Sequence, residues 1–326
     1  MSDRPIPTLL DIIAARQNVY RFLKPTPLYH YPALSDLAGA EIWVKHENHQ
    51  PVGAFKVRGG LNLAANLGLT ERDAGLFTAS TGNHGQSIAY AARAFGIKAT
   101  IAVPDGANPG KVASMRGMGA EVIFHGADFD MAREWMVNVA ADKGGRFVGP
   151  AEAPLIHGVG SYALEIIEDL PDVEMIIVPV GAGSGVSATG IVAKSINPQI
   201  KVIGAQSAQA PAMQHSWKAG KMLSAEMNTF AEGIATRIPF EDTQLIMRRY
   251  LDDFLLVDDE EIEKAILLLL HFTHNLAEGA GAVPLAAALK YPDRVAGKKI
   301  VLVLSGGNLA LERLHQILLK HRSELQ

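Results

Sequence analysis

The stretch Met175–Ile–Ile–Val–Pro–Val–Gly–Ala–Gly–Ser–Gly185 joins an apolar run to a glycine-rich turn. Because a helical pattern follows it, we predict a buried strand, a tight turn and the start of a helix. Backbone N–H groups of such a turn can bind phosphate at the helix N-terminus. A tight turn that binds nothing is the alternative. The third glycine of the dinucleotide fingerprint and the Walker lysine are both missing, so hydride and NTP chemistry have no support.

The same alternation of strands and helices extends along the chain. Further strands are predicted at 41–45, 75–79, 98–104, 121–124, 201–205 and 298–304. Helices are predicted at 55–67, 82–96, 109–119, 128–141 and 309–321. Strands that are apolar throughout indicate an α/β fold whose mainly parallel sheet is covered by helices on both faces. Residues 75–151 form a self-contained series of such units, so we predict a small domain there, inserted into a large domain made of 1–74 and 152–326.

Composition narrows the class of protein. The 326 residues carry 30 Lys+Arg and 34 Asp+Glu, a net charge of −4, and 48% are hydrophobic, which is typical of a globular chain. This balance gives no reason to expect a nucleic-acid or membrane partner. The absence of cysteine excludes disulfides, thiolate metal sites and a cysteine nucleophile. The N-terminal Met1–Pro7 lacks the features of a signal peptide, and the longest apolar run, Ala265–Leu270, is too short to span a membrane. We therefore expect a cytoplasmic protein.

Two motifs fail on their spacing. His46–Glu–Asn–His49 has its histidines three apart, whereas the helical zinc motif needs them four apart to face one side, so no metal site is expected there. Gly185–Val–Ser187–Ala–Thr189 is one glycine short of the nucleophile elbow of hydrolases.

Three further glycine-marked segments could carry chemistry. In Gly53–Ala–Phe–Lys56–Val–Arg–Gly–Gly60, a lysine opens a helix and its amine could enter a cleft, although a solvated lysine is the alternative. Ser80–Thr–Gly–Asn–His–Gly–Gln86 joins a strand to a helix whose N-terminus could hold a carboxylate; the alternative is a helix capped by Ser80 or Thr81. Leu304–Ser–Gly–Gly–Asn308 places a hydroxyl at a strand end, or is simply a capped turn.

Together these segments supply an amine, a carboxylate site, a phosphate site and a hydroxyl. Pyridoxal phosphate needs a Schiff-base lysine, a phosphate site and a partner for its ring nitrogen. The combination therefore indicates a pyridoxal-phosphate enzyme more strongly than any single segment does.

In order and wording, the segments resemble the fold-type II pyridoxal-phosphate enzymes, specifically the serine/threonine dehydratase (ammonia-lyase) and serine racemase family. The resemblance runs from Pro25–Thr–Pro–Leu28 to Asn308 and includes Lys45–His–Glu–Asn48 and Glu278–Gly–Ala–Gly–Ala282. It implies two lobes, each rich in parallel sheet with helices on both faces, and a homodimer.

The resemblance also implies roles for matching residues. Lys56 would attach the cofactor as a Schiff base and move the Cα proton, Phe55 would pack on the pyridine ring, Asn83 would bond its phenolic oxygen, and Ser305 would face its nitrogen. The phosphate would be held by Gly181, Ala182, Gly183 and Ser184. The substrate carboxylate would be held by the loop residues Ser80, Thr81, Asn83 and His84. The implied reaction is α,β-elimination of water from threonine or serine, giving a 2-oxo acid and ammonia.

Departures from the family pattern leave alternatives. Racemases have Ser as the opposite-face proton donor where this chain has Thr81. Thr81 keeps the hydroxyl and is, with Lys56, a candidate catalytic residue, but its extra methyl crowds the site, so racemisation with dehydratase side activity is less favoured. The positions matching the racemase cation site are Gln206, Ala210 and Ala212, which lack its carboxylates, so no metal is expected. Gly158–Val–Gly–Ser–Tyr162, together with Gly183–Ser–Gly185 in the phosphate loop, resembles a side branch that includes hydroxyectoine-utilisation dehydratases. A hydroxyectoine-derived substrate or threo-3-hydroxyaspartate is therefore an alternative to threonine, and a non-catalytic cofactor binder is a third possibility.

The resemblance ends near Asn308, and the residues after it suffice only for a final helix. We therefore expect no C-terminal regulatory domain of the kind found in biosynthetic threonine dehydratases, and a role in amino-acid catabolism.

Overall fold

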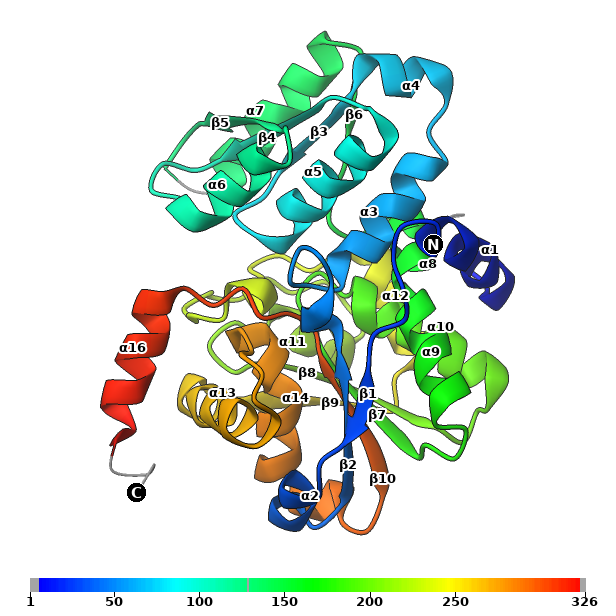
Figure 1. The fold of residues 1–326 in the computed structure, drawn as a ribbon, viewed down its shortest axis with the longest axis vertical. Helices are drawn as coiled ribbons and strands as arrows, with labels where there is room; N and C mark the ends of the chain where they lie inside the picture. Colours follow the sequence, from blue (N-terminus) through cyan, green and yellow to red (C-terminus); the bar gives the residue numbers. More distant parts are fainter. Residues whose placement is uncertain (1–5, 128, 323–326) are drawn as a thin grey trace.

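The computed structural model describes residues 6–127 and 129–322 and contains two sheets, each flanked by helices (Figure 1). The six-stranded sheet has the order β1-β2-β10-β7-β8-β9, and the four-stranded sheet has the order β5-β4-β3-β6. β1 runs antiparallel to β2, and every other pairing is parallel. The predicted α/β fold with two lobes is confirmed; we call them the large lobe and the small lobe after their sheets.

The large sheet consists of β1 (Leu28–His30), β2 (Glu41–His46), β7 (Met175–Pro179), β8 (Lys201–Ser207), β9 (Asp253–Val257) and β10 (Lys299–Leu304). The small sheet consists of β3 (Leu76–Ala79), β4 (Ala99–Val103), β5 (Glu121–Phe124) and β6 (Arg146–Phe147). The helices before β7 are α1 (Leu9–Val19), α2 (Pro32–Ala38), η1 (Glu47–His49), α3 (Lys56–Ala65), α4 (Leu69–Ala74), α5 (Asn83–Phe95), α6 (Pro109–Gly117), α7 (Phe129–Asp142), α8 (Ala153–Val159) and α9 (Ser161–Asp169). Those after it are α10 (Ser184–Ile196), α11 (Ala212–Ala219), η2 (Glu232–Ile234), α12 (Glu241–Tyr250), α13 (Asp259–Thr273), α14 (Gly279–Lys290), α15 (Pro292–Val295) and α16 (Leu311–Lys320).

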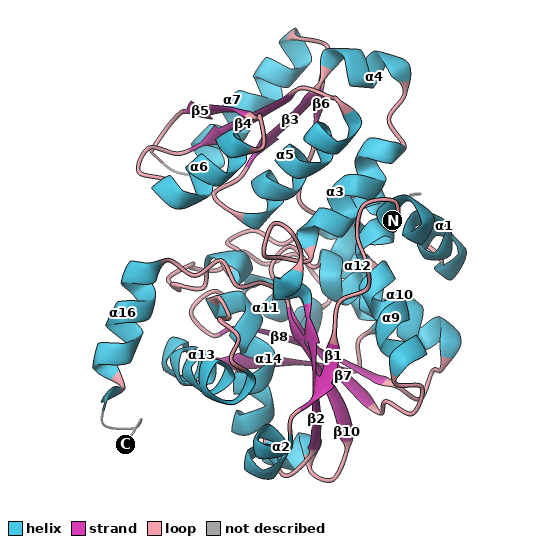
Figure 2. Cartoon of the chain, in the orientation of Figure 1, coloured by secondary structure: helices cyan, strands magenta, loops and turns pink. Residues whose placement is uncertain are grey.

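Helices lie on both faces of each sheet (Figure 2), and apolar side chains fill the space between helices and sheet. One face of the large sheet packs against α2, α13 and α14, and the other against α8, α9, α10 and α12. In the small lobe, α3, α5 and α6 cover one face of the sheet and α7 covers the other. The continuous apolar strands of the sequence are explained by this double covering.

The predicted strands and helices are present, with shifted ends. The predicted helix over 109–119 ends at Gly117, because Gly119 turns the chain at φ +89°. The predicted final helix begins at Leu311, not 309. The strands β1, β6 and β9 were not predicted. Asp128, the expected start of the helix 128–141, and residues 1–5 of the N-terminal segment lie outside the described residues. None of the described helices is long and apolar enough to cross a bilayer.

Helix α3 lies between the two lobes, packed against α5 on one side and α8 on the other (Figure 1). Glycines permit this close approach. A Cβ on Gly60 would lie 2.4 Å from Ser87 Oγ, and one on Gly158 would lie 2.4 Å from the carbonyl oxygen of Arg58. The first residue of this helix is Lys56.

Candidate active site

A tight turn places Lys56 beside the end of β10. Gly53 has φ +67°, a left-handed conformation that favours glycine, and a side chain there would collide with Asn308. The turn then pairs with the loop after β10: the Phe55 N–H donates to the Ser305 carbonyl at 3.0 Å, and Ala54 forms a bridge with Gly306. Two predicted site segments, more than 240 residues apart in sequence, are thus joined through their backbones.

The Lys56 amine is held by two neutral oxygens. Its Nζ donates to the Pro150 carbonyl and to Ser184 Oγ, each at 3.3 Å. Burial of the amine lowers the pKa of Lys56 to about 8. Ser87 Oγ donates to the Lys56 carbonyl at 2.6 Å and so also fixes the backbone of the residue. The amine is therefore partly neutral at physiological pH, whereas a lysine of ordinary pKa is almost fully protonated, and the neutral form is the one a nucleophile or base requires.

The glycine-rich turn before α10 has the geometry of an anion site. Helix α10 starts at Ser184 after Gly183, which has φ +93°, and it has no side-chain cap, so the N–H groups of its first turn remain free. The turn is packed tightly from behind. A Cβ on Gly181 would lie 2.2 Å from the Gly233 carbonyl oxygen, and Thr243 Oγ1 donates to the Ala182 carbonyl at 2.7 Å.

The turn between β3 and α5 is the second helix N-terminus of the site. Helix α5 begins at Asn83 after Gly82 and has no side-chain cap. Ser80 Oγ accepts from the Gly82 N–H at 3.1 Å, and Thr81 is half-buried within the turn. The alternative in which Ser80 or Thr81 caps the helix is therefore not realised, and the first-turn N–H groups remain free to bind an anion.

His84 is buried and neutral. Its Nε2 donates to the Val148 carbonyl at 3.1 Å, which makes Nδ1 the ring acceptor. Nδ1 has no hydrogen-bond partner among the described residues. Burial, together with the nearby positive charge of Lys56, lowers the pKa of His84 to about 3. The imidazole thus adds no charge to the site.

Asn83 connects the two lobes. Its Nδ2 donates to Glu278 Oε1 at 2.7 Å, and its Oδ1 accepts from Asn308 Nδ2 at 2.8 Å. Asn308 Nδ2 also donates to the Val52 carbonyl at 2.8 Å. Burial raises the pKa of Glu278. Both ends of the Asn83 amide are therefore fixed, and its second N–H remains available.

Phe55 has an aromatic support. Its ring meets the ring of the fully buried Tyr162 edge to face, with centroids 6.1 Å apart, and the Lys56 Nζ lies 5.5 Å from the Phe55 centroid. The Tyr162 hydroxyl donates to the Gly185 carbonyl at 3.0 Å. Tyr162 thereby connects the Phe55 ring to the first turn of α10.

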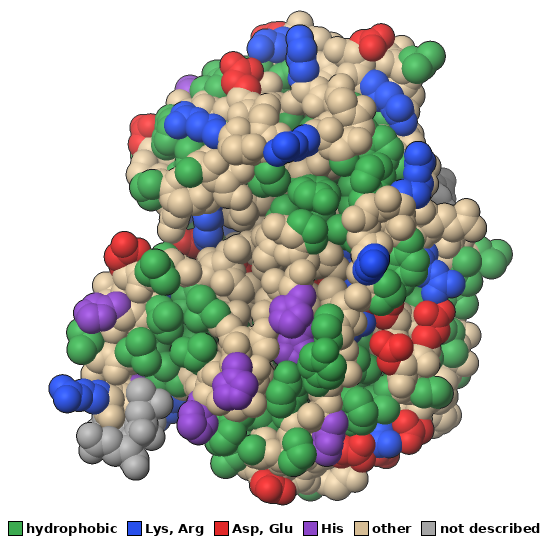
Figure 3. All heavy atoms as spheres, viewed as in Figure 1, with side chains coloured by type: hydrophobic (Ala, Val, Ile, Leu, Met, Phe, Trp, Pro, Cys, Tyr) green, Lys and Arg blue, Asp and Glu red, His purple; other side chains and the backbone are tan. Residues whose placement is uncertain are grey.

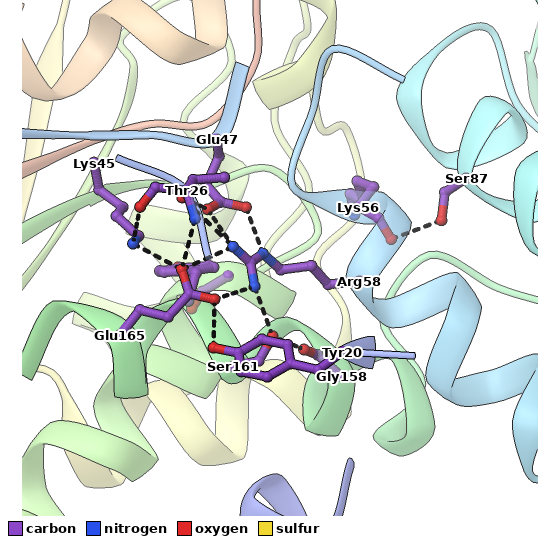
Figure 4. Close-up of polar contacts among 12 residues, drawn as sticks. Tyr20, Thr26, Lys45, Glu47, Lys56, Arg58, Ser87, Gly158, Ser161 and Glu165 are labelled. Carbon is purple, nitrogen blue, oxygen red and sulfur yellow. Dashed lines mark hydrogen bonds and ion pairs between the residues drawn. The ribbon is translucent and has the colours of Figure 1, made fainter. Parts of the chain in front are cut away.

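A buried ionic network anchors α3 next to the amine (Figure 4). Arg58 donates two hydrogen bonds to Glu47, at 2.7 and 2.8 Å, and two to Glu165, at 2.6 and 2.9 Å. Lys45 Nζ lies 2.7 Å from Glu165 Oε2. Burial opposes ionisation, but the charges of Arg58 and Lys45 prevail and hold the pKa of Glu165 below its ordinary value. The charges of two cations and two anions thus balance each other in the core. Arg58, at the centre of this network, lies two residues after Lys56 in the sequence.

A pocket opens between the lobes beside this site. Figure 3 shows a notch between the lobes. The pocket is lined by Glu278 and Asn308 from the network above, together with residues of α6, η2 and α16. Lys111 of α6 forms an ion pair with Glu232 of η2 and so bridges the small and large lobes. Within the described part of the chain, no three histidine or carboxylate side chains converge as metal ligands.

The structure brings together most of the residues predicted for the site. Lys56, Phe55 and Ser184 are in direct contact or hydrogen-bonded, Ser305 is buried beside Phe55, and Asn83 joins the cluster through Asn308. Sequence reasoning assigned no role to Glu278, Asn308, Tyr162, Lys111 or the Pro150 carbonyl. The only signal for the first two was their place in glycine-rich segments, and a carbonyl oxygen has no sequence signal.

The residues present fit pyridoxal phosphate. The amine that would hold the group covalently lies 3.3 Å from a serine hydroxyl at the anion-binding turn. The side-chain-free face of Gly181 and Gly183 is closed from behind by backbone and by Thr243, as expected of a close-packed phosphate loop. An aromatic ring lies beside the amine, and a hydroxyl, Ser305, stands at the end of β10.

Comparison with known proteins agrees with this fit. Residues 19–306 match the family model described as pyridoxal-phosphate dependent enzyme. The L-threonine ammonia-lyase of Thermotoga maritima is 42% identical over 96% of this chain and 78% of its own length. The catabolic L-threonine dehydratase of Escherichia coli is 35% identical, with 94% of each chain covered.

Solved structures give the same family. The processed form of threonine deaminase isoform 2 from Solanum lycopersicum has a TM-score of 0.91 at 30% identity and covers 97% of this chain and 95% of its own. Maize serine racemase has a TM-score of 0.91 at 30% identity, covering 98% and 99%. With the Lys56 amine beside the glycine-rich anion turn, these matches show that the chain belongs to the pyridoxal-phosphate-dependent enzyme family and has the fold-type II architecture.

Proposed function

We propose that this enzyme is an ammonia-lyase that converts threonine to 2-oxobutyrate and ammonia, and serine to pyruvate and ammonia. The observation that carries the proposal is the position of the half-buried Lys56 amine, 3.3 Å from Ser184 at the anion-binding turn. The names of the relatives from Thermotoga maritima and Escherichia coli support threonine as the substrate.

Lys56 is the residue that holds the cofactor and exchanges the Cα proton of the substrate. When bound, pyridoxal phosphate supplies an electron sink that makes this proton acidic. The pKa of Lys56, lowered to about 8 by burial, lets the amine accept a proton at physiological pH and return it later. His84, the titratable neighbour of the amine, stays neutral and does not compete for that proton.

The substrate carboxylate binds at the N-terminus of α5. The free N–H groups of the first turn and the helix dipole favour a negative charge there. The hydroxyls of Ser80 and Thr81, the Asn83 amide and the His84 segment complete the loop. Asn83 is oriented by Glu278 and Asn308, so its remaining N–H can donate to the phenolic oxygen of the cofactor.

Ser305 is the partner of the ring nitrogen, and its chemistry favours elimination. A hydroxyl cannot stabilise a protonated ring as a carboxylate does, so negative charge is poorly stored at the ring. With the cofactor bound, this would favour prompt loss of the β-hydroxyl, which would leave as water by taking up the proton that Lys56 removed from Cα, over racemisation, in which the charge must persist. Ser305 is only 4% exposed, which excludes bulk water as a competing partner.

An amino-acid racemase with dehydratase side activity is the second candidate. It is favoured by the structural likeness to maize serine racemase and by the hydroxyl that Thr81 retains in the turn before α5. The extra methyl of Thr81, compared with the serine of racemases, crowds the opposite face and makes this candidate the weaker one. A larger β-hydroxy amino acid, such as threo-3-hydroxyaspartate or a hydroxyectoine-derived compound, is the alternative substrate.

One assay separates these functions. The purified holoenzyme is incubated with serine, threonine, threo-3-hydroxyaspartate and longer β-hydroxy amino acids, and 2-oxo acid and ammonia are measured along with the chirality of the remaining substrate. We expect equal amounts of 2-oxo acid and ammonia, with threonine or serine turned over fastest. D-serine appearing faster than pyruvate would instead make the enzyme a racemase. Cofactor binding without any 2-oxo acid would make it a non-catalytic binder.

We further propose a homodimer, from the family resemblance. From the sequence pattern we propose a location in the cytoplasm and a small domain over 75–151 inserted into a large domain of 1–74 and 152–326. Sedimentation equilibrium tests the dimer. Limited proteolysis tests the domain boundaries, because cleavage is expected in the connecting segments near 75 and 151.

A further inference from the structure

The half-buried Lys56 amine has an unusual set of partners for a cation drawn away from water. Both oxygens that accept from it, the Pro150 carbonyl and Ser184 Oγ, are uncharged. None of the ion pairs among residues 6–127 and 129–322 involves Lys56. The titratable side chain facing it is His84 of α5, which is neutral. A lysine drawn away from water more commonly has a carboxylate partner, so the neutral acceptors of Lys56 have a chemical consequence.

That consequence concerns the protonation of the amine. A carboxylate at 3 Å would stabilise the ammonium and raise its pKa, whereas a hydroxyl replaces lost water without adding negative charge. The amine can thus be held in a fixed direction and still release its proton near pH 8. The same contact with a neutral hydroxyl therefore fixes the position of the Lys56 amine and leaves its pKa low.

Ser184 is rigidly placed to provide this contact. It is 2% exposed and is the first residue of α10, directly after the left-handed Gly183. Thr243 fixes the preceding turn through its bond to the Ala182 carbonyl. A hydroxyl has one donor and two acceptor sites, so Ser184 Oγ can accept from Lys56 while its O–H donates to an anion at the helix N-terminus.

The next serine of the same helix is used differently. Ser187 lies one turn further along α10 and is fully buried, but its hydroxyl has no hydrogen-bond partner among the described residues. The two serines therefore share helix, burial and chemistry, and they differ in that Ser184 touches Lys56 and stands at the anion-binding turn. Ser187 is a matched control for Ser184.

We propose that Ser184 is a positioning residue for Lys56, whose hydroxyl oxygen holds the amine whenever the amine is not covalently engaged, in addition to the contribution of Ser184 to the phosphate site. The proposal deepens the proposed function, and rests on it for the statement that the amine alternates between bound and free forms. With the cofactor bound, the Lys56 amine would be free whenever the cofactor holds the substrate amine instead. Ser184 then keeps the released amine within reach of the Cα proton rather than letting it swing into the pocket.

The test measures the amine directly, without turnover. Cofactor is removed from the purified enzyme, and all lysines are acetylated competitively over a range of pH. Peptide mass spectrometry then gives the pKa and the reactivity of Lys56 against the other lysines. The variants are Ser184→Ala, Ser184→Gly and the control Ser187→Ala, with circular dichroism melting used to establish that each is folded.

We expect both Ser184 variants to lower the pKa of Lys56 by about half a unit to one unit, because a hydrogen bond to the ammonium form is lost. Ser187→Ala should leave it unchanged. In the reconstituted enzymes, kcat should fall about tenfold for Ser184→Ala through misplacement of the amine. Inorganic phosphate binding to the cofactor-free proteins, measured by calorimetry, reports the separate contribution of Ser184 to the anion site.

An unchanged Lys56 pKa and reactivity in both Ser184 variants would overturn the proposal, as would an equal shift in Ser187→Ala. Failure of the proposed function gives a different result. If wild-type holoenzyme released no 2-oxo acid while the Lys56 pKa still shifted in the Ser184 variants, the contact would stand and the assignment as a lyase would fall.

Discussion

Asn83 Nδ2 lies 2.7 Å from Glu278 Oε1, and this hydrogen bond crosses from the small lobe to the large lobe. An ionised carboxylate only accepts, so the bond fixes which end of the Asn83 amide faces Glu278. Asn308 fixes the other end. A buried acid thus orients an amide at the predicted cofactor site, and the burial that raises its pKa makes the arrangement sensitive to pH.

Glu278→Gln should change how stability depends on pH. The pKa of Glu278 is raised above its ordinary value of 4.5 in the folded protein, so the folded state binds more protons than the unfolded state between the two values. This contribution to stability is present below pH 4.5 and is lost as the pH rises through the folded pKa. Urea unfolding from pH 4.5 to 8 should show the wild type losing stability relative to Glu278→Gln. Parallel curves would contradict the prediction, and the exposed Glu312→Gln is the control.

Lys56→Ala should abolish both covalent cofactor attachment and turnover. We expect the absorbance of bound cofactor to disappear and 2-oxo-acid formation to fall by about a thousandfold or more, because the covalent anchor and the base are lost together. The exposed Lys98→Ala should behave as the wild type in both measurements. Appreciable activity in Lys56→Ala would show that another residue moves the proton.

Arg58→Leu should destabilise the fold severely. It leaves Glu47 and Glu165 buried without their bidentate partner, for which about 3–5 kcal/mol in the free energy of unfolding is expected. Arg146→Leu is the matched control, since Arg146 also pairs with two carboxylates, Glu71 and Glu152, but at the surface. Its cost should be about 0–1 kcal/mol. Equal losses in urea unfolding would mean that the buried network has no special energetic role.

Gly181→Ala should weaken cofactor binding. The new methyl group would overlap the Gly233 carbonyl oxygen, so the turn before α10 must shift, at a cost of about 1–3 kcal/mol. Calorimetric titration of cofactor-free protein with pyridoxal phosphate should show an affinity about 10- to 100-fold lower. Gly117→Ala, where a methyl group meets open space and φ is not left-handed, should bind as the wild type. Unchanged affinity in Gly181→Ala would argue against this turn as the phosphate site.

Local patterns predicted much of the fold. The strands at 41–45, 121–124 and 298–304 were evident from their local runs of apolar residues, and Gly183 marked the turn before α10. The short β6, with two residues, carries too little pattern to be recognised. The antiparallel β1 joins the sheet only because β2 offers it an edge.

Contacts distant in sequence could not be predicted. Arg58 and Glu165 lie 107 positions apart, and Asn83 and Glu278 lie 195 apart. Each residue alone reads as an ordinary charged or polar side chain, and only the folded chain brings the partners together. The lysine itself was predictable because the glycine turn before it and the helix after it are local.

Helix α3 packs against α5 of the small lobe on one side and against α8 of the large lobe on the other. At the closest contacts only glycine fits. Although α3 covers one face of the small sheet, it is therefore held by both lobes. If the lobes rotate relative to each other as substrate enters and product leaves, residues far from α3 are displaced most. Lys56, the first residue of α3, is displaced least. The Lys56 amine, at the start of α3, can therefore keep its orientation while the pocket around it changes shape.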